Sequence, residues 1–499
     1  MTNIREIIQT YKDLCSAYDK KISRDEYRKA NTGYSSGFIE KVWGSWSNFT
    51  EEAEKSLLVN RTDIVKTLKN KKVVITHVPD GADVNLECFY TLENYCDRNK
   101  ADLVILWGKN VKRNKLFDSS TFNLLRPYLA TEVIFEKDKK CLVKDFLIPN
   151  TQKNPLVNLD RLTTGYTTVI VGSCKQYMKI LPYKQYEDYR IAYSTGTISD
   201  VEYKTTVSGA LDEKNHTLGA VLLDYDDNAQ RYVSRNLIFK EGFIYDLNKK
   251  YDKENEYKED TIASMVLGDL HLPEESPSAL MDSLNMVNKY KPQYVFIHDV
   301  ASWNSISHHE FNLPFTRAKN RNNSNQDLET ELNIVEERLN IISEKCPKTT
   351  FCIISSNHDE FVRKYLEKDF NKDTPNARLA AQLFIKYLDG ETILTDVLPE
   401  NFIQLEKNTS CKINGFEVNE HGDCGIAGAK GSVRSFNRGF DSLIHGHTHS
   451  PEIYEKVVVV GTLSKLKLNY NQQGLTNWAH CNCIIHHNGS FQLIFLPQY

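Results

Sequence analysis

Long apolar runs are absent from this chain of 499 residues. Purely aliphatic runs are as short as Val457–Val460, far below the roughly 20 apolar residues that a membrane-spanning helix needs. The first twelve residues carry Arg5 and Glu6 and lack the apolar segment of a secretory signal. We therefore expect a cytoplasmic protein with no membrane partner.

Paired cysteine motifs are absent as well. The 11 cysteines are an odd number, and no zinc-ribbon arrangement of C-x-x-C pairs occurs among them. This pattern is typical of reduced thiols in a cytosolic chain. With 40% hydrophobic and 26% charged residues, the composition excludes disordered, collagen-like and coiled-coil proteins.

Histidine is scarce in the first half of the chain. Only His77 and His216 precede residue 270, and the other 12 of the 14 histidines follow it. Histidine is the commonest metal ligand and proton shuttle in proteins. The distribution therefore predicts that the chemistry lies in the C-terminal half.

Residues 1–70 are predicted to form a small helical domain. Ser23 and Glu26 have the spacing of a capping box, and a second short helix is expected over residues 36–42. The stretch from Ile22 to Phe49 resembles the helix-turn-helix repeats found beside homing endonucleases. That resemblance implies contact with DNA, which the local excess of 14 Lys/Arg over 10 Asp/Glu in residues 1–72 favours. The alternative is a packing or oligomerisation element, which would make the protein a homo-oligomer.

From Lys71 onward, strand-like and helix-like segments alternate. Such a β-α-β series indicates an α/β fold with a largely parallel sheet covered by helices. The expected strands are residues 73–76, 103–107, 265–267, 294–297 and 351–354, and the expected helices are residues 82–99, a segment starting at Pro277, and residues 328–342.

Several short sequences recur in the same order and suggest an internal duplication. The segment 73–108 parallels 265–299, "TTVIVGSCK" (167–175) parallels "TTFCIISSNHD" (349–359), and "GTIS" (196–199) parallels "GTLS" (461–464). The charged stretch 245–262 is the expected boundary, which gives domains 71–250 and 262–499. The alternative is two unrelated α/β domains whose strands have similar sequences.

Five motifs in the second half carry candidate metal ligands. Three of them directly follow expected strands, and the carboxyl ends of parallel strands converge on one crevice. Residues i and i+2 of extended chain point the same way, so two members of one motif can hold one ion. The motifs are Asp269-Leu270-His271, Asp299, Asn357-His358-Asp359, His421-Gly422 and Gly446-His447-Thr448-His449.

The ligand set consists of imidazole, carboxylate and carboxamide groups without thiolates. This set suits Mn, Fe, Zn or Co better than Mg. Seven candidate ligands exceed what one ion needs, so we expect two divalent ions, with Mn favoured. Paired ions about 3.5–4 Å apart generate a hydroxide and clamp both oxygens of a phosphoryl displacement.

The ordered motifs resemble those of the calcineurin-like metallophosphoesterases, across roughly residues 262–499. The resemblance implies a layered α/β sandwich, with the first unit as a degenerate, metal-free copy because it lacks the ligands. It places Asp269, His271, Asp299 and His449 on one ion, and Asp299, Asn357, His421 and His447 on the other. It also makes His358 the proton donor to the leaving oxygen, oriented by Asp359.

Two positions depart from the family pattern. His298 and Ser356 stand where glycines are expected before Asp299 and Asn357, and the residues that often follow the bridging aspartate are missing. His298, His308 or His309 could therefore contribute near Asp299. We expect His445, His480, His486 and His487 to be ordinary core or surface histidines.

Among the substrate classes of that family, we expect nucleic acid to be the substrate of this protein. The helix-turn-helix-like N-terminus and a basic loop containing Arg317, Lys319 and Arg321 favour DNA, as in the SbcD-like nucleases of the family. The sequence thus predicts a metal-dependent DNase. A phosphatase or small-molecule phosphodiesterase, and a non-catalytic DNA-binding or assembly protein, are the alternatives.

Overall fold

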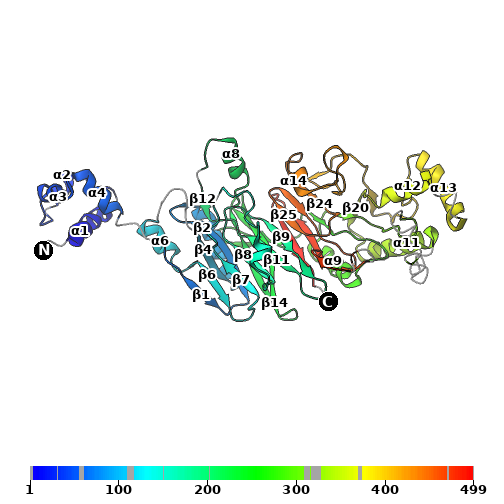
Figure 1. The fold of residues 1–499 in the computed structure, drawn as a ribbon, viewed down its shortest axis with the longest axis horizontal. Coiled ribbons are helices and arrows are strands. Elements are labelled where there is room, and N and C mark those ends of the chain that lie inside the picture. The colour runs from blue at the N-terminus through cyan, green and yellow to red at the C-terminus, as the bar shows by residue number, and fades with distance from the viewer. Residues whose placement is uncertain are drawn as a thin grey trace.

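The computed structural model describes residues 4–55, 61–108, 117–149, 151–201, 203–307, 327–368, 374–468 and 473–497. Residues 19 and 31 within these ranges are not described, and the single residues 315 and 471 are described in addition. Large sheets and several helices make a mixed α/β fold (Figure 1). None of the helices in these ranges is long and apolar enough to cross a membrane.

Four helices form the N-terminal unit, at one end of the elongated molecule (Figure 1). Ser23 and Glu26 form the expected capping box, and Gly44 ends the third helix with φ +81°. Tyr11, Tyr27 and Phe49 are buried at its centre. The helices are α1 (Ile4–Ala17), α2 (Arg24–Lys29), α3 (Ser36–Trp43) and α4 (Trp46–Lys55).

The first α/β unit follows. Its helices are α5 (Leu86–Asn99), α6 (Ser119–Leu125), α7 (Leu159–Leu162) and α8 (Val207–Lys214). Its strands are β1 (Val65–Leu68), β2 (Lys72–Pro79), β3 (Asp83–Val84), β4 (Asp102–Gly108), β5 (Leu129–Ala130), β6 (Glu132–Phe135), β7 (Cys141–Lys144), β8 (Thr168–Val171), β9 (Met178–Leu181), β10 (Tyr183–Lys184), β11 (Arg190–Ser194), β12 (Ser199–Asp200), β13 (Gly219–Asp226), β14 (Arg231–Lys240), β15 (Phe243–Asp246), β16 (Lys249–Tyr251) and β17 (Glu256–Lys258).

The second α/β unit completes the chain. Its helices are α9 (Pro277–Tyr290), α11 (Leu328–Lys345), α12 (Asp359–Lys368), α13 (Ala377–Leu388) and α14 (Val433–Phe436). Its strands are β18 (Ser264–Val266), β19 (Tyr294–His298), β20 (Thr350–Ile354), β21 (Phe402–Gln404), β22 (Lys412–Ile413), β23 (Phe416–Glu417), β24 (Leu443–His445), β25 (Glu452–Tyr454), β26 (Val457–Val459), β27 (Leu475–Thr476), β28 (Cys481–Ile485) and β29 (Phe491–Phe495).

Three large sheets are stacked in layers. An 11-stranded sheet packs one face against both an eight-stranded and a six-stranded sheet, and the core between them is continuous. Helix α5 covers the outer face of the eight-stranded sheet. Helices α9 and α11 cover the outer face of the six-stranded sheet. Each unit therefore has the layer order helices, sheet, sheet, and a short helix, α7 or α14, packs on the outer face of the 11-stranded sheet.

The two α/β units repeat one strand topology. In the eight-stranded sheet, β14-β13-β2-β4-β5 have the same order and directions as β29-β28-β18-β19-β20 in the six-stranded sheet. In the 11-stranded sheet, β6-β7-β8-β11-β9 repeat as β22-β23-β24-β26-β25. Antiparallel pairing of β9 with β25 joins the two series, so the repeats face each other across these two strands.

Hydrogen bonds repeat between the units as well. The carbonyl oxygen of Asp269 accepts from Leu463 N at 2.7 Å and Thr462 Oγ1 at 2.9 Å. The carbonyl oxygen of His77 accepts in the same way from Ile198 N at 3.0 Å and Thr197 Oγ1 at 2.8 Å. His77 thus occupies the position of Asp269, and the "GTIS" and "GTLS" segments form equivalent turns.

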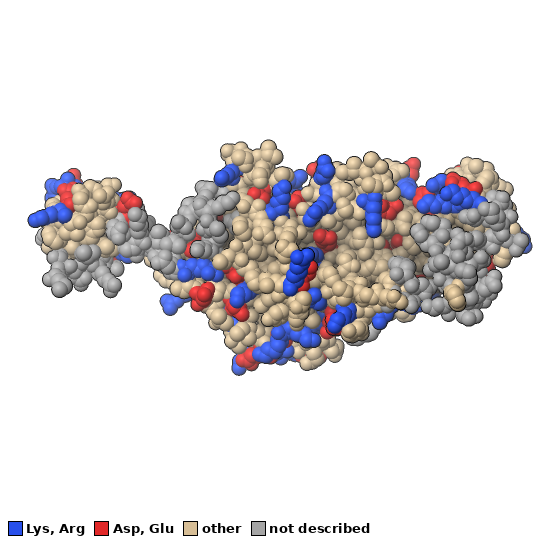
Figure 2. Space-filling model, in the orientation of Figure 1, with Lys and Arg blue, Asp and Glu red and all other residues tan. Residues whose placement is uncertain are grey.

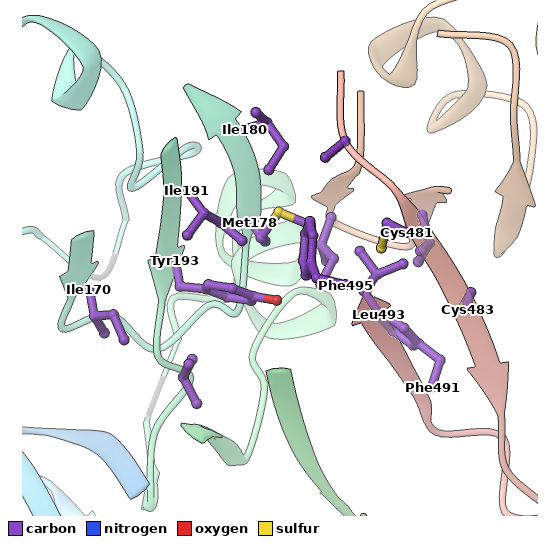
Figure 3. Packing of buried hydrophobic residues seen from close by; sticks show 14 of the residues in the cluster. Ile170, Met178, Ile180, Ile191, Tyr193, Cys481, Cys483, Phe491, Leu493 and Phe495 are labelled. Carbon is purple, nitrogen blue, oxygen red and sulfur yellow. The ribbon is translucent and has the colours of Figure 1, made fainter. Parts of the chain in front are cut away.

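The hydrophobic core extends across both units. Figure 3 shows Met178 on β9 and Tyr193 on β11 beside Phe495 on β29. Nearby, Asn236 Nδ2 donates to Phe491 O at 2.8 Å, and Gln492 Nε2 donates to Asn236 O at 3.0 Å. The two units are therefore fused through a shared sheet and a shared core.

Three sequence-based assignments are wrong. Strand β8 lies in the 11-stranded sheet and matches β24, whereas β20 lies in the six-stranded sheet, so 167–175 does not correspond to 349–359. The expected boundary at 245–262 contains β16 and β17, and the first unit extends past residue 250. The helical domain does not reach residue 70, because β1 pairs with β6 in the 11-stranded sheet.

A buried ion pair occupies the first unit where the second has metal-ligand candidates. Ser173-Cys174-Lys175 follows Gly172, as His447-Thr448-His449 follows Gly446, and Lys175 Nζ lies 2.8 Å from Asp212 Oδ1. Both side chains are more than nine-tenths buried. Lys175 Nζ also donates to Gln152 O at 2.9 Å. The ammonium group therefore pairs with a carboxylate inside this unit.

Replacing Lys175 with methionine is expected to destabilise the fold strongly. Loss of the ammonium leaves the Asp212 carboxylate buried and unpaired, which typically costs about 3–5 kcal/mol. The midpoint of urea unfolding should fall, and the exposed-site control Lys253→Met should retain the wild-type midpoint. The double variant Lys175→Met/Asp212→Leu should recover most of the loss. A wild-type midpoint for Lys175→Met would contradict the ion-pair role.

Candidate metal centre

The seven predicted ligands lie together where strands of two sheets end. Asp269 and His271 follow β18, Asp299 follows β19, and Asn357 lies between β20 and α12. The other three follow β23 and β24 of the 11-stranded sheet; they are His421, His447 and His449. The candidate centre therefore lies at the edge shared by the two sheets of the second unit.

Four of these residues have left-handed backbone conformations. Their φ angles are 55° at His271, 47° at Asp299, 73° at His447 and 57° at His449. Residues other than glycine adopt such conformations at a cost, and they cluster at functional sites where the surrounding structure holds them. Four of the seven candidate ligands therefore lie at positions of local backbone strain.

Four buried side chains form a cluster that could hold a metal ion. One ligand atom from each of Asp269, His271, Asp299 and His449 lies within 4.8 Å of the others. His271 Nε2 is 2.9 Å from His449 Nε2 and 3.4 Å from Asp299 Oδ2. His449 Nε2 is 3.1 Å from Asp269 Oδ2.

The remaining predicted ligands adjoin this cluster. His421 Nε2 lies 3.4 Å from Asp299 Oδ2 and 3.1 Å from Asn357 Oδ1. His447 Nδ1 lies 3.1 Å from the same Asn357 oxygen. Asp299 therefore has the cluster of four on one side and Asn357, His421 and His447 on the other.

The donor set fits a divalent cation. Asp269 Oδ1 and Asp299 Oδ1 are buried without a hydrogen-bond partner, an arrangement that costs free energy unless a cation or donor compensates it. Burial lowers the pKa of His271 to about 3, so its imidazole is neutral and able to ligate. The two imidazole nitrogens at 2.9 Å also match a pair of ligands at about 2.0–2.1 Å from one ion with an angle near 90°.

Electrostatics at the centre are dominated by the two carboxylates. Burial alone would raise the pKa of Asp299, but the surrounding imidazoles outweigh it and hold that pKa well below its usual range. Burial alone would lower the pKa of His421, but Asp299 raises it to about 9. The two buried carboxylates thus favour positive charge at the centre, which suits a bound cation.

His358 lies beside the cluster, with a different orienting contact from the one expected. Its Nε2 is 3.9 Å from Asp299 Oδ2, and its Nδ1 is 2.9 Å from the carbonyl oxygen of Ser302. Asp359 accepts instead from the backbone N–H of Ser356 at 2.9 Å, at the start of α12. The carbonyl of Ser302 therefore takes the role expected of Asp359.

Other sequence candidates lie outside the centre or outside the described residues. His298 Nδ1 is 3.4 Å from His421 Nδ1, behind that ligand's ring. His445 and His480 hydrogen-bond to backbone carbonyls, and His486 stacks on Tyr245. The residues that the structure does not describe include His308, His309, Arg317, Lys319 and Arg321.

Sequence patterns did not identify Trp478 as part of the centre. Its ring packs edge-on against His449, with centroids 4.1 Å apart. Tyr183 Oη on β10 donates to Trp478 O at 2.6 Å, and β10 pairs with β27 just before Trp478. A short arm of the first unit thus supports the residue that packs on His449, and no ligand motif could have revealed this.

Substituting Trp478 with leucine is expected to weaken metal binding. The smaller side chain frees the His449 ring, and changes behind the ligands typically cost about 10- to 100-fold in metal affinity. Competition with a chromogenic chelator would measure that affinity, and Trp43→Leu in the N-terminal unit is the matched control. Wild-type affinity in Trp478→Leu would show that the ring does not position His449.

Comparison with known proteins finds a relative of comparable length. The chain is 25% identical to "Protein A1" of Escherichia phage T5 over 466 residues, which cover 85% of this chain and 82% of that protein. No protein-family model matches the chain, and no solved structure matches it. The relative's name states no activity, so function is argued from the site.

Proposed function

We propose that this protein is a metal-dependent phosphodiester hydrolase acting on DNA, related to the SbcD-like calcineurin-type metallophosphoesterases. One observation carries the proposal: six ligand-type side chains from separate motifs converge around buried Asp299, with His358 at the edge of the cluster. The helices-sheet-sheet layers of the second unit support the corresponding layered sandwich.

Two divalent ions suit the donor groups better than one. Asp269, His271, Asp299 and His449 would hold the first ion, and Asp299, Asn357, His421 and His447 the second. Imidazole, carboxylate and carboxamide ligands favour Mn, with Fe, Zn and Co as alternatives. When bound, such a pair supplies Lewis acidity and makes water nucleophilic at neutral pH.

The residues of the chain bind, orient and transfer a proton. Asp299 would hold both ions at a fixed separation, because its carboxylate lies between the two ligand groups. His358 donates from Nδ1 to Ser302 O, which leaves Nε2 facing the cluster, and in the imidazolium form Nε2 would carry the transferable proton. A departing alkoxide is a poor leaving group, and protonation by His358 would assist its departure.

Nucleic acid is favoured over small phosphoesters by the N-terminal unit. Its described helices form a separate aromatic core, and α2, α3 and the start of α4 lie in the stretch from Ile22 to Phe49 that resembles a helix-turn-helix repeat. Such a unit is suited to bind a long polyanion away from the metal centre.

One experiment separates these classes. Linear duplex, single-stranded and circular DNA are compared with a nitrophenyl monoester and a nitrophenyl diester, each with Mn, Mg or EDTA. We expect Mn-dependent degradation of DNA and little monoester turnover. Turnover of the monoester without DNA degradation would overturn the nuclease proposal, and activity that survives EDTA would overturn the metal centre.

Removing residues 1–60 is expected to weaken DNA binding. Phosphate contacts release counterions, so the affinity should also depend less steeply on salt concentration. The deletion ends before Arg61, whose guanidinium pairs with Asp145 at 2.9 Å, and before β1, so both α/β units stay intact. Filter binding across a salt series measures the effect. An unaltered slope would make the N-terminal unit an assembly element.

A further inference from the structure

The segment 423–440 after the ligand His421 gathers basic side chains on an exposed surface. Its exposed cationic residues are Lys430, Arg434 and Arg438, and its only acidic residue is Asp423, which is half-buried. We propose that these three side chains, named here the 430–438 surface, bind the phosphate backbone of the nucleic acid. This inference rests on the proposed function and identifies the surface that leads substrate to the metal centre.

The base of the segment is fixed against the metal-ligand motifs. Gly422 has φ +104°, and a Cβ there would overlap His445 Nδ1. A Cβ on Gly431 would overlap Gly422 O, and Gly431 N donates to Asp423 O at 2.9 Å. Only glycine at both positions permits this close approach, so Lys430 is held next to the residues that follow His421.

A second anchor holds the other end of the segment. The ring of Phe436 on α14 packs against His445, with centroids 4.9 Å apart. His445 ends β24 and precedes Gly446 and His447 of the ligand motif. Arg434 and Arg438 flank Phe436 in the chain, so the backbone that carries them is fixed to the strand that leads into His447.

Some cations of the second unit are ion-paired, whereas, among the residues that the structure describes, those of the 430–438 surface are not. Arg363, Lys407 and Lys465 pair with Glu360, Glu360 and Glu274 respectively. Within the described part of the chain, Lys430, Arg434 and Arg438 form no ion pair within 4 Å, although Arg434 lies near Glu452 and Tyr454. Lys430 and Arg438, exposed and without a carboxylate partner among the described residues, are suited to bind neighbouring phosphates of one strand beside the proposed centre, and Arg434 would add to them.

Figure 2 shows lysine and arginine dispersed among aspartate and glutamate over the visible face, and the net charge of the chain is −4. A polyanion therefore gains little from the molecule as a whole. Cations at the rim of the centre would therefore determine how tightly the nucleic acid binds and which of its phosphates lies at the centre.

The test compares two triple variants of equal charge change. Lys430→Gln/Arg434→Gln/Arg438→Gln removes the 430–438 surface, whereas Lys69→Gln/Lys71→Gln/Lys253→Gln removes exposed, ion-paired lysines of the first unit. Binding of duplex and single-stranded DNA is measured by filter binding in EDTA across a salt series. Degradation rates with Mn, for DNA and for a nitrophenyl diester, are measured in parallel.

We expect the first variant to reduce the slope of log affinity against log salt by about 3, one unit per lost phosphate contact. Its DNA rate should fall relative to its diester rate, and its Mn content should equal that of wild type. The control should keep the wild-type slope. If wild type degrades DNA and both variants share its slope, the surface is wrong while the proposed function stands. If wild type neither binds nor degrades DNA, both are overturned.

Discussion

Asp299→Asn is expected to abolish hydrolysis and to remove most of the bound metal. Asp299 is buried, and one of its oxygens lies 3.4 Å from both His271 Nε2 and His421 Nε2, members of the two ligand groups. Asparagine keeps the volume of the side chain but removes the charge that both ions would share. Loss of a single residue should therefore empty two positions together.

Elemental analysis after Mn loading and gel filtration measures this effect. Wild type should contain about two ions per chain, and Asp299→Asn clearly fewer than one. Asp441→Asn is the matched control, because Asp441 is exposed in the same unit and contributes to no ligand group. Mn content equal to wild type in Asp299→Asn would show that Asp299 is not the bridge, and one ion per wild-type chain would contradict the two-metal centre.

The clustering of the candidate ligands was predictable from the sequence, whereas parts of the sheet topology were not. Asp269, Asp299 and Asn357 directly follow strands whose carboxyl ends meet, so a local rule brought distant motifs together. Strands β8 and β20 have similar β-branched sequences, and only their pairing partners place them in different sheets. The residue composition of a strand does not determine which strands it pairs with. This explains the mistaken alignment of 167–175 with 349–359.

Charged strands were missed for a related reason. Strands β16 and β17 lie at the edge of the eight-stranded sheet, where Lys249 pairs with Glu256 at 2.6 Å. Edge strands carry charges that discourage pairing with other chains, so their sequence is similar to that of a linker. The contact between His358 and the carbonyl of Ser302 was missed because a backbone acceptor leaves no signature in the sequence.

His358→Ala is expected to lower the rate of DNA hydrolysis by about 100- to 10,000-fold, the usual contribution of a general acid. Its Nε2 lies 3.9 Å from Asp299 Oδ2, and metal ligation is assigned to other residues, so the metal content should equal that of wild type. The loss should shrink for a nitrophenyl diester, whose leaving group needs no proton. Asp359→Asn should cost less, because Asp359 contacts Ser356.

Steady-state rates on DNA and on the nitrophenyl diester, with Mn content measured on the same samples, decide the role of His358. His487→Ala is the control, since His487 is exposed and its Nε2 bonds to Thr261 O, away from the ligand groups. A proton donor predicts unequal losses on the two substrates with full metal occupancy. Equal losses would assign His358 to substrate positioning, and reduced Mn content would assign it to the ligands.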